Sequence, residues 1–213
     1  MLRVPVRPER SDGDSENSKS GIFVPMDFSN DIENCLTVLQ QGGVILYPTD
    51  TVWGLGCDAT NPLAVEKVFS IKKRAAENSL IILLAEERDI LKYVSQVDLQ
   101  VFDYLETVQK PTTVIYEGAI GIADNAVNKD GTVAIRLVKE DFCRHLLKRF
   151  RKPIVSTSAN ISGEPTAGKF PEITESIKRS VDYIVQYRQE DKSEANPSAI
   201  VRWKAGKVEV IRS

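Results

Sequence analysis

Several features are scarce in this sequence of 213 residues, and each scarcity excludes a class of protein. The chain has one histidine and only three cysteines, Cys35, Cys57 and Cys143, which lie far apart. A disulfide framework needs cysteines in pairs, and a structural zinc site needs cysteine and histidine at close spacing. We therefore expect three buried free thiols rather than disulfides or a zinc site.

Long apolar runs are also missing. No stretch is long enough to cross a bilayer, and no apolar signal-peptide core follows the basic residues at the N-terminus. The sequence therefore predicts a cytoplasmic protein with no membrane segment. The net charge is only -2, so any affinity for nucleotide or RNA must come from a local basic cluster and not from the overall field.

What is present is typical of a globular α/β protein. Hydrophobic residues make up 42% of the chain and charged residues 27%, and the length suits one sizeable domain. Residues 1–27 are mostly polar and predict a mobile tail, for which a basic RNA-binding arm through Arg3, Arg7 and Arg10 is the functional alternative. Residues 28–213 are expected to form the domain.

Helix and strand signals alternate along that domain. Residues 31–41 predict a helix that Ser29 or Asn30 caps, residues 63–72 a helix that Asn61 caps, and the apolar runs 44–47 and 80–84 predict strands. The fold class is therefore α/β, a single domain with a twisted, mixed parallel and antiparallel sheet flanked by helices. Further strands are expected at 113–116, 133–137, 154–156, 183–186, 199–203 and 208–211, the last two as a hairpin, and further helices at 99–108, 141–150 and 172–179.

Three segments are too polar to be explained by core packing alone. Residues 47–56 leave a strand for a turn rich in hydroxyls, residues 71–74 place three cations at a helix end, and residues 153–166 follow a strand with many small polar groups. Such loops at strand ends often bind ligands. Each segment also has a purely structural interpretation. The first could be a turn held by its own hydrogen bonds, the second a solvated helix end whose cations complement the helix dipole, and the third an ordinary serine-rich loop.

Taken together, in this order and spacing, the segments resemble the YrdC family of threonylcarbamoyl-AMP synthases. The residues that carry the resemblance are the turn 47–56, the pair Lys72 and Arg74, and the pair Ser158 and Asn160. The resemblance implies a YrdC-like fold around a basic concave cavity, without the C-terminal extra domain of longer relatives. It implies a nucleotidyltransferase that makes threonylcarbamoyl-AMP and pyrophosphate from L-threonine, bicarbonate and ATP, with Mg²⁺ carried by the ATP phosphates, for the threonylcarbamoyladenosine modification of tRNA.

The same resemblance assigns roles to individual residues. A catalytic group of four, Lys72, Arg74, Ser158 and Asn160, is expected around the ATP phosphates, and tRNA and tRNA-modification proteins are the expected partners. Threonine is expected at Thr51, Arg136 and Ser156, with the guanidinium of Arg136 on its carboxylate. ATP is expected at Arg74, Asn78, Thr132, Ser158, Thr166, Ser198 and Arg212.

Some positions depart from the family pattern. Trp53 replaces a tyrosine, Ala75 and Ser79 replace prolines, and Leu83 stands where some members place a threonine-contacting histidine. These changes bear on amino-acid selectivity and leave the group of four intact. The single histidine, His145, lies on the predicted helix 141–150 and is expected to have a surface or packing role. The alternative function is a YrdC-like module that binds RNA or nucleotide without making the adenylate, and a third is an AMP-forming carbamoyl-transfer domain for another substrate.

Overall fold

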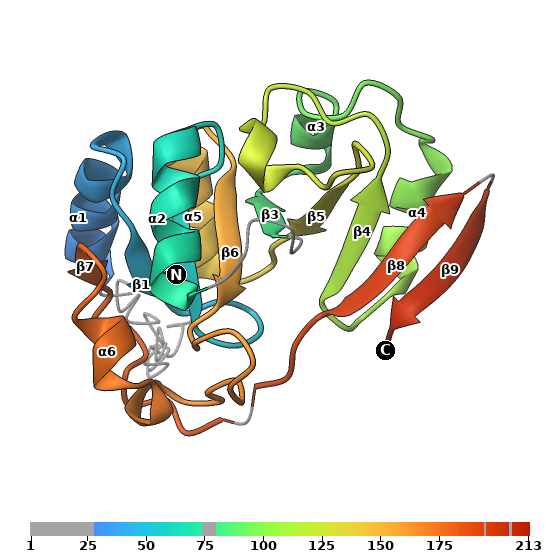
Figure 1. The fold of residues 1–213 in the computed structure, drawn as a ribbon. Helices are drawn as coiled ribbons and strands as arrows, with labels where there is room; N and C mark the ends of the chain where they lie inside the picture. The colour runs from blue at the N-terminus through green and yellow to red at the C-terminus, as the bar shows by residue number, and fades with distance from the viewer. Residues whose placement is uncertain (1–27, 74–79, 194, 205) are drawn as a thin grey trace, which may run out of the picture.

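A nine-stranded sheet runs through the protein, in a computed structural model that describes residues 28–73, 80–193, 195–204 and 206–213. The strands lie in the order β7-β1-β2-β6-β3-β5-β4-β8-β9 (Figure 1). The strands are β1 (Ile45–Tyr47), β2 (Gly54–Asp58), β3 (Ile81–Leu84), β4 (Thr112–Tyr116), β5 (Val133–Leu137), β6 (Ile154–Ser158), β7 (Tyr183–Ile184), β8 (Ala199–Lys204) and β9 (Lys207–Arg212).

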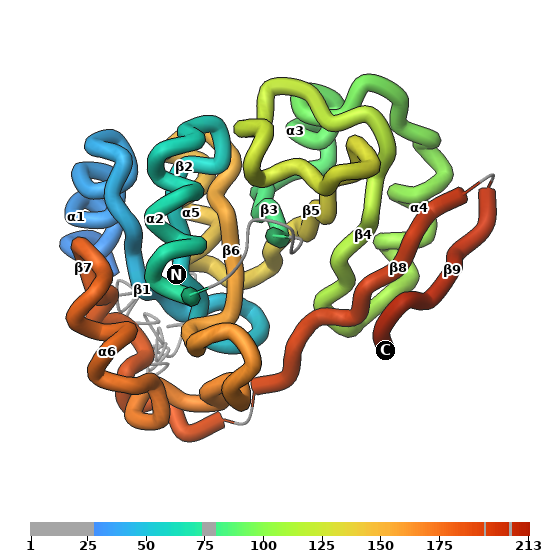
Figure 2. Tube along the Cα trace, in the orientation of Figure 1, coloured from blue at the N-terminus to red at the C-terminus, as the bar shows by residue number. Residues whose placement is uncertain are grey.

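The pairing of these strands is mixed, which confirms the predicted fold class. Three pairs are parallel, namely β1 with β7, β3 with β5, and β4 with β8. The remaining neighbours are antiparallel, including the terminal hairpin of β8 and β9, in which Lys204 lies opposite Lys207. Figure 2 shows how the chain after β7 returns across the molecule to enter β8, so the last hairpin extends the sheet at the far edge.

Helices cover parts of both faces of the sheet. The helix α5 buries Phe142, Cys143 and Leu146 along one side, at the three- and four-residue spacing of an amphipathic helix. It packs against α1, where the rings of Phe28 and Phe142 meet edge to face with centroids 5.6 Å apart. The helices are α1 (Ser29–Gln40), α2 (Pro62–Lys72), α3 (Glu87–Ile90), α4 (Gln100–Thr107), α5 (Asp141–Phe150) and α6 (Glu175–Lys178), with short 3₁₀ turns η1 (Asp124–Ala126) and η2 (Phe170–Glu172).

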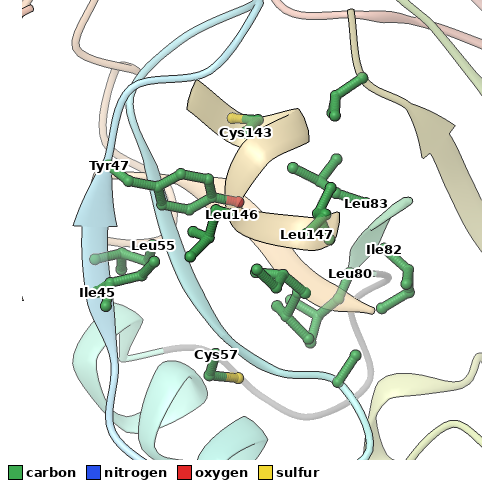
Figure 3. Close-up of a cluster of buried hydrophobic side chains, with 14 of the residues drawn as sticks. Ile45, Tyr47, Leu55, Cys57, Leu80, Ile82, Leu83, Cys143, Leu146 and Leu147 are labelled. Carbon is green, nitrogen blue, oxygen red and sulfur yellow. The ribbon is translucent and has the colours of Figure 1, made fainter. Parts of the chain in front are cut away.

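Two glycines of β2 make room for Tyr47 on the α5 side of the sheet. A Cβ at Gly56 would lie 2.6 Å from Cε1 of Tyr47, and a Cβ at Gly54 would lie 3.1 Å from the Ser156 hydroxyl. Figure 3 shows the Tyr47 ring in the buried cluster with Leu146 and Cys143 of α5. Because side chains alternate along a strand, Cys57 points to the other face, where α2 packs on β2. Glycine is thus required where the sheet faces the tyrosine.

Several predicted elements need correction. The strand β2 was expected to be part of a turn, because its two glycines lower the strand signal. The first helix begins at Ser29 after Phe28, and neither Ser29 nor Asn30 caps it through a side chain. The predicted helix 172–179 is instead η2 followed by α6, since Ile173 between them has extended backbone with ψ of 127°.

Other predictions are confirmed at residue level. The three cysteines are buried and unpaired. Asn61 caps α2 by accepting hydrogen bonds from the amides of Leu63 and Ala64. Among the helices that the structure describes, none has the length and apolar character that a membrane span requires. The predicted tail, residues 1–27, and the departures at Ala75 and Ser79 lie outside the described residues.

Candidate functional site

A cavity of about 380 Å³ opens on the face of the sheet that carries Gly54. Strand register explains its composition, since Gly54 lies opposite Ser158, and Ser156 opposite Ile81, which in turn pairs with Ala134. Small or polar side chains in this row leave a hollow where larger ones would fill the space. Its lining is Thr51, Val52, Gly54, Ile81, Ile115, Asn128, Ala134, Arg136, Ser156, Thr157, Ser158, Thr166, Pro197, Ser198, Ile200, Ile211 and Arg212.

Arg136 is the most deeply buried cation in that lining. Its side chain is 3% exposed, and its Nη2 lies 3.0 Å from Oδ1 of Asp50. Its Nε has no hydrogen-bond partner among the described residues. An unpaired buried donor is costly, so this guanidinium has spare capacity for an acceptor such as a carboxylate in the cavity.

Lys72 holds the loop that forms the adjoining wall. Its side chain is buried, and Nζ donates to the carbonyl oxygens of Ser158 and Asn160 at 2.5 and 2.8 Å. The Ser158 hydroxyl donates to Oδ1 of Asn160 at 2.5 Å, and the Asn160 amide donates to the carbonyl of Glu164 at 2.7 Å. These bonds fix the turn after β6, so the residues of the predicted lysine and serine-asparagine motifs, distant in sequence, meet in space.

The opposite wall comes from the ends of β5, β8 and β9. The hydroxyl of Ser198 lies 2.9 Å from that of Thr113, and Arg212 donates to the Ser198 carbonyl at 2.8 and 3.2 Å. The Asn128 amide donates to the Thr132 hydroxyl at 2.8 Å. The last strand therefore contributes its terminal arginine to a site built mainly from earlier segments.

The threonine-rich turn after β1 forms the rim. The hydroxyls of Thr49 and Thr51 lie 3.0 Å apart, and the Thr51 amide donates to the Thr49 hydroxyl. Both side chains are buried. Hydrogen bonds within the turn hold Thr49, as the structural interpretation of this segment predicts. Thr51 also lines the cavity.

The predicted site residues fall into three groups. Seven line the cavity, three support it from behind, and two lie outside the described residues. Their roles stay predictions, because position alone does not show which ligand each touches. The lining group is Thr51, Arg136, Ser156, Ser158, Thr166, Ser198 and Arg212; the supporting group is Lys72, Asn160 and Thr132; the residues outside the description are Arg74 and Asn78.

Sequence reasoning missed two contributors and singled out three residues that lie elsewhere. Asp50, which pairs with Arg136, lies in the polar turn 47–56 but was assigned no role in the site, and Asn128, which lines the cavity, stands in no pattern that marks it. Leu83 is 1% exposed in the core beside Leu147 and does not line the cavity (Figure 3). The other two are Trp53, whose ring packs on Phe170, and His145, which is exposed beside Phe28 as predicted.

The site is rich in hydrogen-bond donors. The described residues contain no group of three or more histidine, cysteine, aspartate or glutamate side chains placed to hold a metal ion. A Mg²⁺ ion that arrives on nucleotide phosphates would be held there by phosphate oxygens, as is usual for this ion. The cavity can therefore bind an anionic ligand through guanidinium groups, hydroxyls and loop amides.

Comparison with known proteins gives the family. The Sua5/YciO/YrdC model, described as "Telomere recombination", matches residues 37–213. A threonylcarbamoyl-AMP synthase of Pseudoalteromonas translucida is 34% identical over 157 residues, 72% of this chain and 84% of that protein. One from Idiomarina loihiensis is 33% identical over 162 residues, 75% of this chain and 86% of that protein.

A solved structure shows the same fold. The structure of P. abyssi Sua5 complexed with L-threonine has a TM-score of 0.76 at 22% identity, covering 85% of this chain and 53% of Sua5. This chain thus spans about half of Sua5, although it spans most of the two bacterial synthases. With a family match over residues 37–213 and two relatives above 30% identity, the chain belongs to the Sua5/YciO/YrdC family.

Proposed function

We propose that this protein is an L-threonylcarbamoyladenylate synthase. In the reaction, the threonine amine takes up the carbon of bicarbonate as a carbamate, with loss of water. A carbamate oxygen then attacks the α-phosphorus of ATP, the bond to the β-phosphate oxygen breaks, and pyrophosphate leaves. The class is that of a nucleotidyltransferase, because an adenylyl group moves from pyrophosphate to the carbamate.

The observation that carries this proposal is the buried Arg136 in the cavity wall. Its unpaired Nε and its fixed position beside Asp50 suit the carboxylate of an amino acid. The hydroxyls of Thr51 and Ser156 line the same cavity and would bind the polar groups of threonine. The names of the two bacterial relatives support the same substrate.

Phosphate binding falls to the neighbouring loop and to the end of the chain. The turn that Lys72 holds presents the Ser158 hydroxyl to the cavity, and Arg212 and Thr166 line it from other segments. We assign Arg74 and Asn78, which lie two and six positions after Lys72 in sequence, to the nucleotide as well. Negative charge grows on the phosphates during transfer, so positioning and charge stabilisation by these groups would supply the catalysis, with Mg²⁺ adding charge on the phosphates.

The product is a mixed anhydride, which hydrolyses readily and must be consumed by an acceptor. We propose that the acceptor is an adenosine of tRNA, through tRNA-modification partner proteins that receive threonylcarbamoyl-AMP. A nucleotide-binding or RNA-binding module of the same fold is the alternative function, and it would need neither threonine nor turnover of ATP.

A pyrophosphate-release assay separates these functions. With ATP, Mg²⁺ and bicarbonate, release should depend on L-threonine and fail with carbamoyl phosphate in place of threonine and bicarbonate. Arg136→Lys keeps the charge but loses the planar fork, so we expect KM for threonine to rise roughly tenfold to hundredfold.

The matched control is Arg149→Lys, which alters an exposed arginine paired with Glu33. Its kinetics should equal those of the wild type, because a surface ion pair contributes little. Circular dichroism verifies that both variants fold. ATP binding without threonine-dependent pyrophosphate release from the folded wild type would show that the protein is a binding module.

A further inference from the structure

Three isoleucines line one side of the cavity, one from each of β4, β8 and β9. They are Ile115, Ile200 and Ile211, and the amide side chain of Asn128 lines the same cavity from the loop that enters β5. Apolar side chains of this kind suit the faces of a flat ring, but they offer no hydrogen bond to its edge. Asn128 is therefore a candidate to recognise a ring that lies against the isoleucines.

The loop that carries Asn128 lies away from the arginine of the cavity. Its last residue, Thr132, comes just before β5, and Ala134 and Arg136 follow on that strand. Because side chains alternate along a strand, these three residues face the same side of the sheet. Thr132 lies roughly 13 Å from Arg136 along the chain at the rise of a strand. One ligand could thus contact the arginine region with one part and the loop with another.

Hydrogen bonds leave the Asn128 amide only one orientation. Asp130 accepts from the Thr132 hydroxyl at 2.6 Å and from the Thr132 backbone amide at 3.1 Å. These bonds, and then the guanidinium of Arg202, hold the pKa of Asp130 below its ordinary 3.8, so at neutral pH its carboxylate can only accept. The Thr132 hydroxyl donates its proton to that carboxylate. It must therefore accept from Asn128, whose Nδ2 lies 2.8 Å away.

This orientation leaves the amide with a free acceptor beside a donor. Among the described residues, none donates to Oδ1 of Asn128. Nδ2 carries two N–H groups, and Thr132 takes one of them. The loop backbone needs neither side-chain atom, because the Asn128 N–H donates to the Thr132 carbonyl and the Asn128 carbonyl accepts from Gly131. The polar edge of the amide is therefore available to a ligand in the cavity.

An acceptor and a donor on one amide match the edge of adenine. Adenine presents its 6-amino donor beside a ring-nitrogen acceptor, and asparagine can bind both at once. A purine with a 6-oxo group presents an acceptor in the place of the amino group. Only a flipped amide would match that group, and the bonds from Asn128 to Thr132 and from Thr132 to Asp130 oppose the flip.

We propose that Asn128 selects adenine over 6-oxopurines in the nucleotide, and that Asp130 positions the amide for this through Thr132. The inference rests on the proposed function for the presence of a nucleotide in the cavity, and on the hydrogen bonds of the loop for the choice of base. Asn128 is then the residue that touches the base, whereas Asp130 and Thr132 are positioning residues.

The test is isothermal titration calorimetry of the protein with Mg²⁺ and one nucleotide at a time, without threonine. The nucleotides are ATP, purine riboside triphosphate, which lacks the 6-amino group, inosine triphosphate, which has a 6-oxo group, and 2′-deoxyATP. The wild type should bind ATP about threefold to tenfold more tightly than purine riboside triphosphate, because one hydrogen bond is lost. Inosine triphosphate should bind roughly tenfold to hundredfold more weakly than ATP.

Two variants separate recognition from positioning. Asn128→Ala should bind ATP and purine riboside triphosphate with affinities that agree within about twofold, while the ratio of ATP to 2′-deoxyATP stays as in the wild type. In Asp130→Asn the new amide can donate to the Thr132 hydroxyl, which can then donate to Oδ1 of Asn128 and allow the flip. The preference for ATP over inosine triphosphate should fall several-fold. These ratios do not depend on the fraction of each variant that is folded.

The matched control is Asn125→Ala. It removes an amide three residues earlier in the chain, whose Nδ2 donates to the Pro62 carbonyl and which does not line the cavity. Its ratios should equal those of the wild type. Equal binding of ATP and purine riboside triphosphate by the wild type, or an unchanged ratio in Asn128→Ala, would overturn the proposal. A change in the ratio of ATP to 2′-deoxyATP instead would place Asn128 at the ribose and overturn it as well.

Threonine-dependent pyrophosphate release is measured on the same samples. Release by the wild type from ATP and inosine triphosphate with equal kcat/KM would overturn this inference and leave the proposed function standing. A preference for ATP in binding, without any release, would overturn the proposed function and leave the role of Asn128 standing. A wild type that binds none of the four nucleotides would overturn both.

Discussion

At the scale of single residues, Lys72 is a buried ammonium that contacts the loop after β6. The resemblance to the family predicts a lysine at the phosphates, but its ammonium is buried against the carbonyls of Ser158 and Asn160. An ammonium has three donors and a strong hydration shell, so it is buried only where acceptors replace the water. We therefore propose that Lys72 positions the loop after β6, and its expected role at the ATP phosphates stays a prediction.

Replacing Lys72 by methionine keeps its length and removes those bonds. We expect the free energy of unfolding in urea to fall by roughly 1–3 kcal/mol, because two part-buried carbonyls lose their bond to the ammonium. Amide hydrogen exchange at Asn160 and Ser162 should accelerate, and pyrophosphate release should drop.

The matched control lies on the same helix. Lys67 donates to the carbonyl of Gly42 at 2.8 Å, away from the cavity. Lys67→Met should cost about 1 kcal/mol and leave pyrophosphate release intact. Similar exchange rates at Asn160 in the Lys72 variant and in the wild type would contradict the positioning role.

At the scale of elements, the segment between β7 and β8 supports the rim of the cavity. Arg188 lies in it with φ of 64° and donates to the Thr49 carbonyl at 3.2 Å. Its Nε and Nη2 donate to Asp191 at 3.0 and 2.8 Å. The segment that returns to β8 thus holds the threonine-rich turn through one guanidinium.

Arg188→Asn should loosen that turn without disturbing the backbone, because asparagine tolerates a positive φ. We expect KM for threonine to rise roughly threefold to tenfold, with a smaller change in kcat. Arg151→Asn makes the same exchange at the left-handed residue after α5 and should leave both constants unchanged. A fall in kcat alone would argue against a role in threonine binding.

The same segment has a predictable response to acid. Hydrogen bonds from Ser193, and then from Arg188, lower the pKa of Asp191 to about 2 from the ordinary 3.8. A carboxylate with a lowered pKa stabilises the folded state above its unfolded pKa, and that stability is lost as pH falls through the folded value.

Asp191→Asn removes this titration. Its unfolding free energy should therefore lie below that of the wild type above pH 3.8, and the gap should close as pH falls to about 2. Urea denaturation at several pH values measures the gap, which solvent screening keeps small at this partly exposed position. A gap that stays constant across that range would show that Asp191 acts only through packing.

Elements with strong local signals could be predicted from the sequence. Asn61 and Pro62 mark the start of α2, and the apolar runs mark β3 and β5, because each signal lies within a few residues. The strand β2 could not be predicted, because glycine weakens the local strand signal. Its two glycines are there to leave room for Tyr47 of β1, a contact that the local sequence does not reveal. The ion pair of Asp50 with Arg136 could not be predicted either, because it depends on tertiary packing that brings the turn after β1 beside β5.

At the scale of the whole molecule, the order of the strands in the sheet could not be predicted from the sequence. The motifs at Lys72 and Ser158 were expected to meet, and they do, through β6 lying between β2 and β3. That placement is not encoded in any local pattern, because it depends on pairing between strands about 70 residues apart, Ile81–Leu84 and Ile154–Ser158.

One continuous sheet should unfold as one unit, and the two tryptophans can report on this. Trp53 packs on Phe170 near β2, while Trp203 on β8 donates to Asp98 at 2.8 Å near the other edge. We expect Trp53→Phe and Trp203→Phe, each leaving a single tryptophan, to give one urea transition whose midpoint agrees with far-ultraviolet circular dichroism of the same variant. If the β4-β8-β9 edge melted independently, the Trp203 signal would change at lower urea than circular dichroism, whereas the Trp53 signal would not. Coincident midpoints would instead support residues 28–213 as a single domain, because every strand of the sheet would then lose its pairing together.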